Sequence, residues 1–312
     1  MEVIYSKDKQ ISIKESILTV GSYDGIHLGH RKLLSELVQN SKDYGIPSIV
    51  VTFDPHPREI LNGKLNDFPL IMNMEQKLKI IEACGVDIVY VINFTEDYSK
   101  IAANDFMNHT IIPFFNPKII IIGSNHYFGR GREGSPLYLR NFGKKNNIQI
   151  IIIQPVLNKN EEISSTRIRE FITSGFVEKA NYELGTKFSI QGVVVHGLGR
   201  GRKLNFPTAN INPSDKRQLL PKIGVYLIHG RINGLNAFGM CNLGVRPTFS
   251  EKNLVMEIHF LHDRVANLYG KKVKVEFLER IRDEKKFPTS KDLIKQLNID
   301  KQTCLEISSK YN

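Results

Sequence analysis

The sequence predicts an α/β domain with a parallel sheet, followed by a small antiparallel β-barrel with a terminal helix. Three observations support this fold class. The chain has 312 residues, about twice the length of a typical domain. In residues 1–184, continuous apolar runs alternate with helical patterns, which is typical of parallel strands buried on both faces. In residues 185–312, strand-like runs follow one another with Gly, Pro and Asn turns between them, as in small barrels.

Each element of the first half has its own pattern. Short β-rich apolar runs predict strands, and apolar residues at helical spacing predict helices. The first helix is marked by Leu33, Leu34, Leu37 and Val38. The expected strands are 17–20, 48–53, 87–92, 118–122 and 148–154. The expected helices are 28–44, 74–84, 101–112 and 165–173, with further helical material between the last two strands.

The second half lacks this alternation. Its expected strands are 189–196, 224–231, 235–242, 254–261 and 272–278, and a helix over about 290–308 closes the chain. The boundary is expected within residues 175–186, which gives domains of 1–184 and 185–312.

Composition excludes several classes of protein. Hydrophobic residues are 41% and charged residues 24%, as in a globular protein with a sizeable core. No apolar run approaches the roughly 18 residues of a membrane span, and no basic segment leads into an apolar one at the start. Cys84, Cys241 and Cys304 lie too far apart for a disulfide framework or a metal knuckle. We therefore expect a cytoplasmic protein with no membrane partner.

The net charge of +11 is unevenly distributed. Residues 1–184 hold 21 basic and 21 acidic residues, whereas residues 185–312 hold 22 basic and 11 acidic residues. This excess of positive charge could bind a polyanion, such as a nucleotide triphosphate, or could belong to a solvated lysine-rich surface. Both explanations stay open, and nucleic acid is not the expected partner.

A histidine pair follows the first predicted strand and opens the next helix. Imidazoles three residues apart at a helix start can face one side, and the glycine between them lets a phosphate approach the backbone. Helix N-termini also attract anions. The segment therefore predicts a phosphate site, although one histidine could instead be structural and the other merely exposed. Its candidate residues are Gly21, Asp24, His27, Gly29 and His30.

A second polar cluster follows the fifth predicted strand. Ser164, Thr166 and Arg167 open the next helix and form a second candidate phosphate cradle, with a simple helix cap as the alternative. Both clusters lie at the carboxyl ends of strands, where open α/β sheets bind ligands.

Two further loops end strands of the same sheet. One contains Phe53, Pro55 and His56, and the Gly-rich loop 123–134 contains Asn125 and Phe128. Such loops suit a flat ring and a phosphate, although ordinary turns explain Gly and Pro equally well. Residue type also allows zinc at His27, His30 and His56, but no spacing or thiol supports it.

The barrel half begins with a Gly-rich cationic segment. Gly197, Gly199 and Arg202 belong to a run suited to closing over phosphates, with a Gly-rich hairpin as the alternative. Thr208 and Asn210 offer the oxygen ligands that Mg²⁺ takes beside ATP phosphates, and they are the predicted metal ligands.

One carboxylate stands inside an apolar strand of the barrel. By alternation, Glu257 shares a face with Val255 and His259. Taken alone, such a carboxylate is either a surface residue or a held general base.

The first half, over about 15–185, resembles the FMN adenylyltransferase module of bacterial bifunctional riboflavin kinase/FAD synthetases, within the nucleotidylyltransferase superfamily. The motifs are His27-Leu-Gly-His30, Ile163-Ser-Ser-Thr-Arg167, Phe53-Asp-Pro-His-Pro57 and the loop 123–134. The resemblance implies a Rossmann-like domain that adenylylates FMN with MgATP and releases pyrophosphate. It implies His27, His30 and Arg167 as catalytic residues near the ATP phosphates. Asn125 stands where the family usually has Asp.

The second half, over about 186–310, resembles the riboflavin kinase module. The resemblance rests on Pro207-Thr-Ala-Asn210, Asn242-Leu-Gly244, Glu257-Ile-His259 and a segment containing Arg282 and Phe287. It implies that Thr208 and Asn210 bind MgATP, that Glu257 deprotonates riboflavin, and that Arg282 and Phe287 contact the flavin. Asn205 replaces a usual Gly, and His262-Asp-Arg264 replaces a more acidic stretch.

The resulting prediction is a cytoplasmic enzyme that makes FMN from riboflavin and FAD from FMN, using ATP and Mg²⁺ in both steps. One alternative is a monofunctional FMN adenylyltransferase with a silent kinase-like domain. Others are an adenylyltransferase for another phosphate-bearing acceptor, and a basic nucleic-acid-binding protein that reuses the fold. The oligomeric state stays open.

Overall fold

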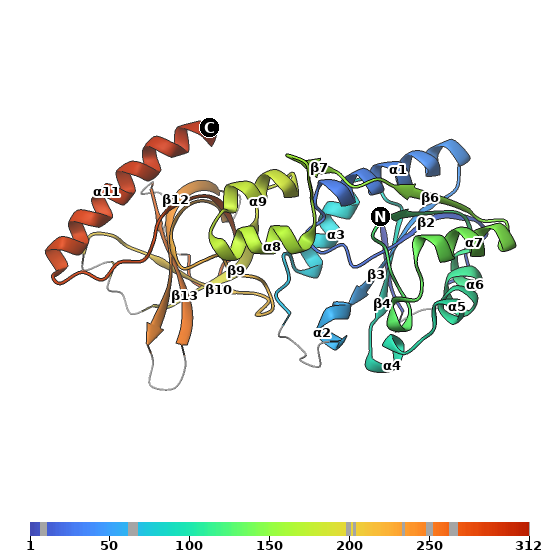
Figure 1. Ribbon diagram of the computed structural model, residues 1–312. Coiled ribbons are helices and arrows are strands. Elements are labelled where there is room, and N and C mark those ends of the chain that lie inside the picture. The colour runs from blue at the N-terminus through green and yellow to red at the C-terminus, as the bar shows by residue number, and fades with distance from the viewer. Residues whose placement is uncertain are drawn as a thin grey trace. The chain divides into compact units, whose positions relative to one another are not determined.

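The computed structural model describes residues 1–6, 11–61, 68–197, 201, 204–232, 235–247, 252–261 and 268–311. The chain divides into two compact units, Met1–Ser165 and Thr166–Asn312. Figure 1 shows a sheet covered by helices in the first unit and a barrel in the second. Among the described residues, every helix is too short or too polar to span a membrane.

The first unit contains a six-stranded parallel sheet with the order β1-β4-β3-β2-β5-β6, which confirms the predicted α/β class. Its strands are β1 (Glu2–Tyr5), β2 (Ser16–Val20), β3 (Ser48–Asp54), β4 (Ile88–Asn93), β5 (Pro117–Gly123) and β6 (Gln149–Ile153). A short antiparallel pair follows, β7 (Leu157–Asn158) with β8 (Glu161–Glu162). Strand β1 was not predicted, because a four-residue edge strand beginning with Glu lacks a clear apolar run.

Two hydrophobic cores lie on opposite faces of this sheet. Helices α1 (Leu28–Tyr44) and α3 (Met74–Ala83) cover one face, and the helices between Ala103 and Asn146 cover the other. The remaining helical segments of the unit are α2 (Pro57–Leu61), α4 (Glu96–Ser99), α5 (Ala103–Phe106), η1 (Met107–Ile111), α6 (Ile112–Phe115), η2 (Arg130–Arg132) and α7 (Pro136–Asn146).

The helix predicted over 101–112 contains a π-helical turn. Residues Met107–Ile111 form this turn between α5 and α6, and Pro113 lies just beyond it. Proline has no N–H for the ordinary ladder, and a wider turn is one way in which a helix accommodates such a break.

The strand order reverses between β2 and β5. From β2, the chain proceeds through β3 and β4 toward one edge, and from β5 to β6 toward the other. The loops after β2 and β5 therefore flank the switch point, which is where open α/β sheets bind ligands.

The second unit contains a closed antiparallel barrel with the order β10-β13-β12-β11-β14-β9, as predicted. Its strands are β9 (Ser189–Val195), β10 (Ala209–Pro213), β11 (Gly224–Ile232), β12 (Leu235–Pro247), β13 (Lys252–Phe260) and β14 (Lys272–Arg282). Strand β10 was not predicted, because its sequence, Ala-Asn-Ile-Asn-Pro, is rich in residues that strands disfavour.

Helices α8 (Ser165–Ser174), α9 (Val177–Leu184) and α11 (Ser290–Ser308), with η3 (Ser309–Tyr311), complete the described elements. The segment 175–186, expected to carry the boundary, is mostly the helix α9. Asn181 of α9 donates to the Phe277 carbonyl of β14 and accepts from the Phe188 amide, at 2.8 and 2.6 Å. The boundary at 184 and 185 stays a prediction.

Candidate functional site

In the first unit, the chain turns from β2 into α1 through the predicted histidine pair. His27 caps the helix, and its Nδ1 accepts from the His30 backbone N–H at 3.4 Å. The two imidazoles stack with centroids 3.8 Å apart, and Tyr23 packs edge-on against His30. A Cβ on Gly29 would lie 3.1 Å from the His27 ring, so glycine leaves room for this stack.

Both imidazoles are held in a state that resists protonation. Burial lowers the pKa of His27 to about 4. Burial, followed by the charges of His27 and Lys77, lowers the pKa of His30 well below its ordinary range. Lys77 of α3 is itself buried, and its Nζ donates to the Ser22 carbonyl at 2.7 Å. Sequence reasoning missed this lysine, because a single Lys in an amphipathic helix is usually exposed.

Asp24 shapes the loop between β2 and α1. Its carboxylate is 2% exposed and accepts from the backbone N–H of Ile71 at 3.1 Å. Its backbone carbonyl accepts from the Ser165 hydroxyl at 2.7 Å, which ties the loop to the last residue of the first unit. Gly21 packs against the Tyr23 ring, which a Cβ there would approach to 2.9 Å.

The second polar cluster is split between the two units. Ser164 is half-buried and belongs to the first unit, whereas the exposed Thr166 and the half-buried Arg167 belong to the second. Arg167 donates from Nε to Glu183 of α9 at 2.9 Å and lies over the Phe171 ring.

In the loop after β3, the predicted ring-bearing residues pack against other rings of the first unit. His56 is 7% exposed and stacks on Phe68 with centroids 4.6 Å apart. Phe53 packs edge-on against Phe94, and Pro55 follows a cis peptide bond.

The loop after β5 is held by contacts at both ends. Phe128 pairs with Gly134 through two backbone hydrogen bonds, and its ring packs on Phe106 and His126. Asn125 donates from Nδ2 to Glu162 at 2.7 Å. A carboxylate at position 125 would face that of Glu162, so the amide suits this chain.

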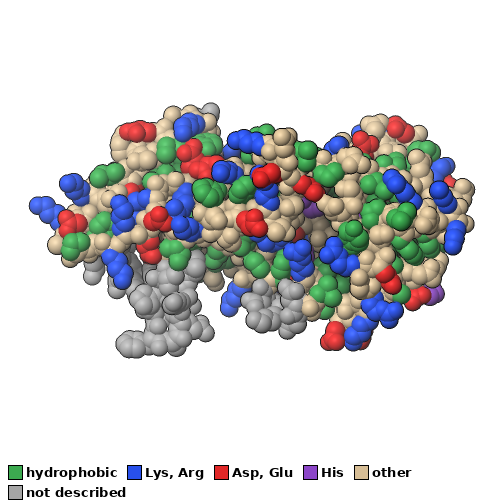
Figure 2. Space-filling view, in the orientation of Figure 1, with side chains coloured by type: hydrophobic (Ala, Val, Ile, Leu, Met, Phe, Trp, Pro, Cys, Tyr) green, Lys and Arg blue, Asp and Glu red, His purple; other side chains and the backbone are tan. Residues whose placement is uncertain are grey.

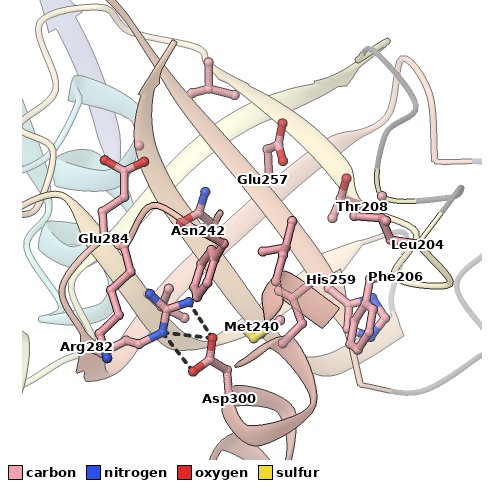
Figure 3. A pocket seen from close by; sticks show the side chains of 18 of the residues that line it. Leu204, Phe206, Thr208, Met240, Asn242, Glu257, His259, Arg282, Glu284 and Asp300 are labelled. Carbon is pink, nitrogen blue, oxygen red and sulfur yellow. Dashed lines mark hydrogen bonds and ion pairs between the residues drawn. The ribbon is translucent and has the colours of Figure 1, made fainter. Parts of the chain in front are cut away.

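The second unit contains a cavity of about 360 Å³, large enough for a small ligand. It brings together the predicted Thr208, Asn210, Glu257, Arg282 and Phe287. Figure 3 labels Thr208, Glu257 and Arg282 among the side chains around it. The other lining residues are Gly201, Leu204, Phe206, Val225, Met240, Asn242, Gly244, Val255, His259, Glu284, Lys285, Leu293, Leu297 and Asp300.

Glu257 lies in a row of polar residues across three strands. In the strand register, it is opposite Asn210 of β10 on one side and Asn242 of β12 on the other. Val255, Glu257 and His259 all line the cavity, as the predicted alternation requires. The cavity therefore presents a carboxylate between two amides.

Two glycines pack closely against the predicted metal ligands. A Cβ on Gly197 would come within 2.0 Å of Asn210, and one on Gly201 within 3.1 Å of the Thr208 hydroxyl. Gly199 and Arg202, as well as positions 262–264, lie outside the described residues.

Arg282 is held by the terminal helix. Its guanidinium forms hydrogen bonds to both carboxylate oxygens of Asp300, the shortest at 2.6 Å, and packs near the Phe287 ring. Asp300 is 1% exposed and also accepts from Gln296. No motif pointed to Asp300, because its position in α11 looks like any polar helix residue.

Among the described residues, no group of three His, Cys, Asp or Glu side chains could hold a metal ion. On the face shown in Figure 2, basic and acidic side chains are interspersed over both units. The two units have the features of a class of protein, the two-domain transferases that use nucleotides. One unit has a polar helix start after β2, at the switch point of its sheet, and the other has a barrel cavity lined by a carboxylate.

Comparisons with known proteins identify the family. The FAD synthetase family model matches residues 9–167, and the riboflavin kinase model matches residues 184–308. A bifunctional riboflavin kinase/FMN adenylyltransferase from Buchnera aphidicola subsp. Schizaphis graminum is 36% identical over 95% of this chain and 94% of its own length. One from Bacillus subtilis is 32% identical over 99% of both chains. This chain belongs to the bifunctional riboflavin kinase/FMN adenylyltransferase family, which confirms the resemblance predicted from its motifs.

A solved structure matches along nearly the whole chain. It is described as a macrolide-efflux protein from Streptococcus pneumoniae, with a TM-score of 0.89 and 31% identity, covering 97% of this chain and 99% of its own. That description differs from those of the curated relatives, which agree with the family models for both halves.

Proposed function

We propose that the two units catalyse successive steps of FAD synthesis. The barrel unit transfers the γ-phosphoryl group of ATP to the terminal hydroxyl of riboflavin, and the α/β unit transfers AMP from ATP to FMN with release of pyrophosphate. The observation that supports this most directly is the cavity that places Glu257 between Asn210 and Asn242, beside Thr208. ATP supply makes the cytoplasm the proposed location.

In the kinase step, an alcohol must lose its proton before it attacks phosphorus. Glu257 is the proposed general base, because its carboxylate lines the cavity on a strand whose neighbours position it. Arg282 and Phe287 are proposed to contact the flavin. Asp300 would orient the Arg282 guanidinium through their paired hydrogen bonds.

The donor atoms near Glu257 suit Mg²⁺. The Thr208 hydroxyl and the Asn210 amide supply neutral oxygens, and glycines pack against both side chains. These residues would hold the ion together with the ATP phosphates, where it would offset their negative charge. Gly197, Gly199 and Arg202 are proposed to complete the nucleotide-binding segment.

In the adenylyl transfer step, the phosphate of FMN is already an anionic nucleophile. Catalysis therefore needs alignment and charge stabilisation more than a base. His27 and His30 are proposed to donate hydrogen bonds to the ATP phosphates, with Gly29 allowing close approach. Ser164, Thr166 and Arg167 would bind the triphosphate end, and Gly21 and Asp24 would shape the nucleotide loop.

The loops after β3 and β5 are proposed to bind the flavin of FMN. Their candidate residues are Phe53, Pro55, His56, Asn125 and Phe128. Phe53 and Phe128 each pack on other aromatic rings, and such a cluster suits a flat ring system.

A chromatographic product assay with MgATP tests the proposal. Riboflavin should yield FMN and then FAD, and FMN supplied alone should yield FAD. Formation of FAD from FMN without any FMN from riboflavin would favour the monofunctional alternative. No product in either reaction would refute both assignments.

A further inference from the structure

His259 has no role in the mechanism described above. It lies on β13 two residues after Glu257, is 7% exposed, and lines the same cavity. A buried histidine beside a proposed general base could act on the substrate or could fix a neighbouring segment. Its contacts favour the second role.

The His259 ring joins β13 to the segment before β10. Its Nδ1 lies 2.9 Å from the Pro207 carbonyl oxygen. A carbonyl oxygen only accepts, so Nδ1 carries the proton and donates it. The ring also packs against Phe206 with centroids 5.1 Å apart.

This hydrogen bond lies just outside the strand ladder. The described pairing of β10 with β13 begins at Ala209 and Ile258 and continues through Asn210 and Glu257. Backbone pairing therefore positions Asn210, whereas Thr208 precedes the paired residues. The bond from His259 fixes the carbonyl that leads directly into Thr208.

We propose that His259 is a positioning residue for the phosphoryl transfer step. It holds the Pro207–Thr208 peptide against β13, so that the Thr208 hydroxyl faces MgATP in fixed relation to Glu257. This inference rests on the proposed kinase function of the barrel unit. Loss of the bond should weaken productive MgATP binding more than riboflavin binding.

Three substitutions at position 259 distinguish the effect of losing the Nδ1–H donor from the effect of losing the volume of the ring. His259→Leu removes the donor, whereas His259→Asn returns an N–H near the position of Nδ1. His259→Gln carries the same amide one bond further out, near Nε2, and serves if the leucine variant does not fold. His229→Leu is the matched control, because His229 pairs with Glu276 on β14 and does not line the cavity.

The readouts are the KM values for MgATP and riboflavin in FMN formation, with FAD formation from FMN as an internal control. His259→Leu and His259→Gln should raise the KM for MgATP about tenfold, near the upper end of what one hydrogen bond contributes, with less effect on the KM for riboflavin. His259→Asn should stay within about threefold of the unmodified chain. FAD formation from FMN should be unchanged in every variant, and His229→Leu should leave the KM for MgATP unchanged.

If the unmodified chain makes FMN from riboflavin, the kinase function is upheld. Two results would then overturn the inference about His259. One is an unchanged KM for MgATP in both His259→Leu and His259→Gln. The other is an asparagine variant as impaired as these two. An unmodified chain that makes no FMN from riboflavin would instead refute the proposed kinase function, and this inference with it.

Discussion

At the residue scale, burial decides the chemistry of the histidine pair. His27 and His30 stack on each other beside a buried lysine, and both have lowered pKa values. They are therefore neutral at physiological pH, and each can donate a hydrogen bond from one ring nitrogen. Phosphate binding at this helix start would then rely on N–H donors and the helix dipole more than on imidazolium charge.

Acid should destabilise the first unit through His27. Its pKa is about 4 in the folded chain and 6.5 ordinarily, so the unfolded chain binds the proton first as pH falls. Stability from this source is complete above about pH 6.5 and is lost as pH falls toward 4, by about 3 kcal/mol. Urea unfolding at pH 7.5 and pH 4.5 measures it.

His27→Asn is the matched control, since Asn also caps helices but does not titrate. The asparagine variant should lose less stability between the two pH values. An identical loss in the two proteins would contradict this account of His27.

Asn205 shows that a departure from the family's sequence pattern can leave the backbone conformation unchanged. Asn205 replaces a usual glycine, which from sequence alone raised the alternative of a silent kinase. Its φ is 60°, in the left-handed region that Asn adopts more readily than most residues. The backbone shape that glycine would provide is therefore retained, a point that only the dihedral angle could establish.

At the element scale, the ion pair between Arg167 and Glu183 joins α8 to α9. Glu183 is fully buried, and Arg167 is 19% exposed. Because Arg167 belongs to a motif that predicts phosphate binding, its substitution has two separable effects, one on activity and one on stability.

Arg167→Ala should lower the free energy of unfolding of the second unit by about 3 kcal/mol, because it leaves a buried carboxylate without this cation. Thermal or urea unfolding measures the change. Adding Glu183→Gln to that variant should recover part of the loss, because the amide carries no charge. Arg167→Ala with unchanged stability would show that the pair is not needed for folding.

At the scale of the whole molecule, the sequence predicted both architectures, and five of its candidate site residues line the barrel cavity. Short apolar runs and helical spacing are local signals, so β2 to β6 and α1 were predictable. Strands β1 and β10 were not, since β1 is short and lacks a clear apolar run, and β10 is rich in residues that strands disfavour. Tertiary packing positions three further residues at the two sites, Lys77, Asn242 and Asp300. Of these, only Asn242 belonged to a motif noted in the sequence.

The central claim is that one chain holds two independent sites that act in succession. Two variants incubated separately and together with riboflavin and MgATP test it directly. His30→Ala alone should stop at FMN, Glu257→Ala alone should leave riboflavin unchanged, and the mixture should produce FAD because FMN passes between the two proteins. A mixture that makes no FAD, or either variant losing both activities while folded, would contradict the account.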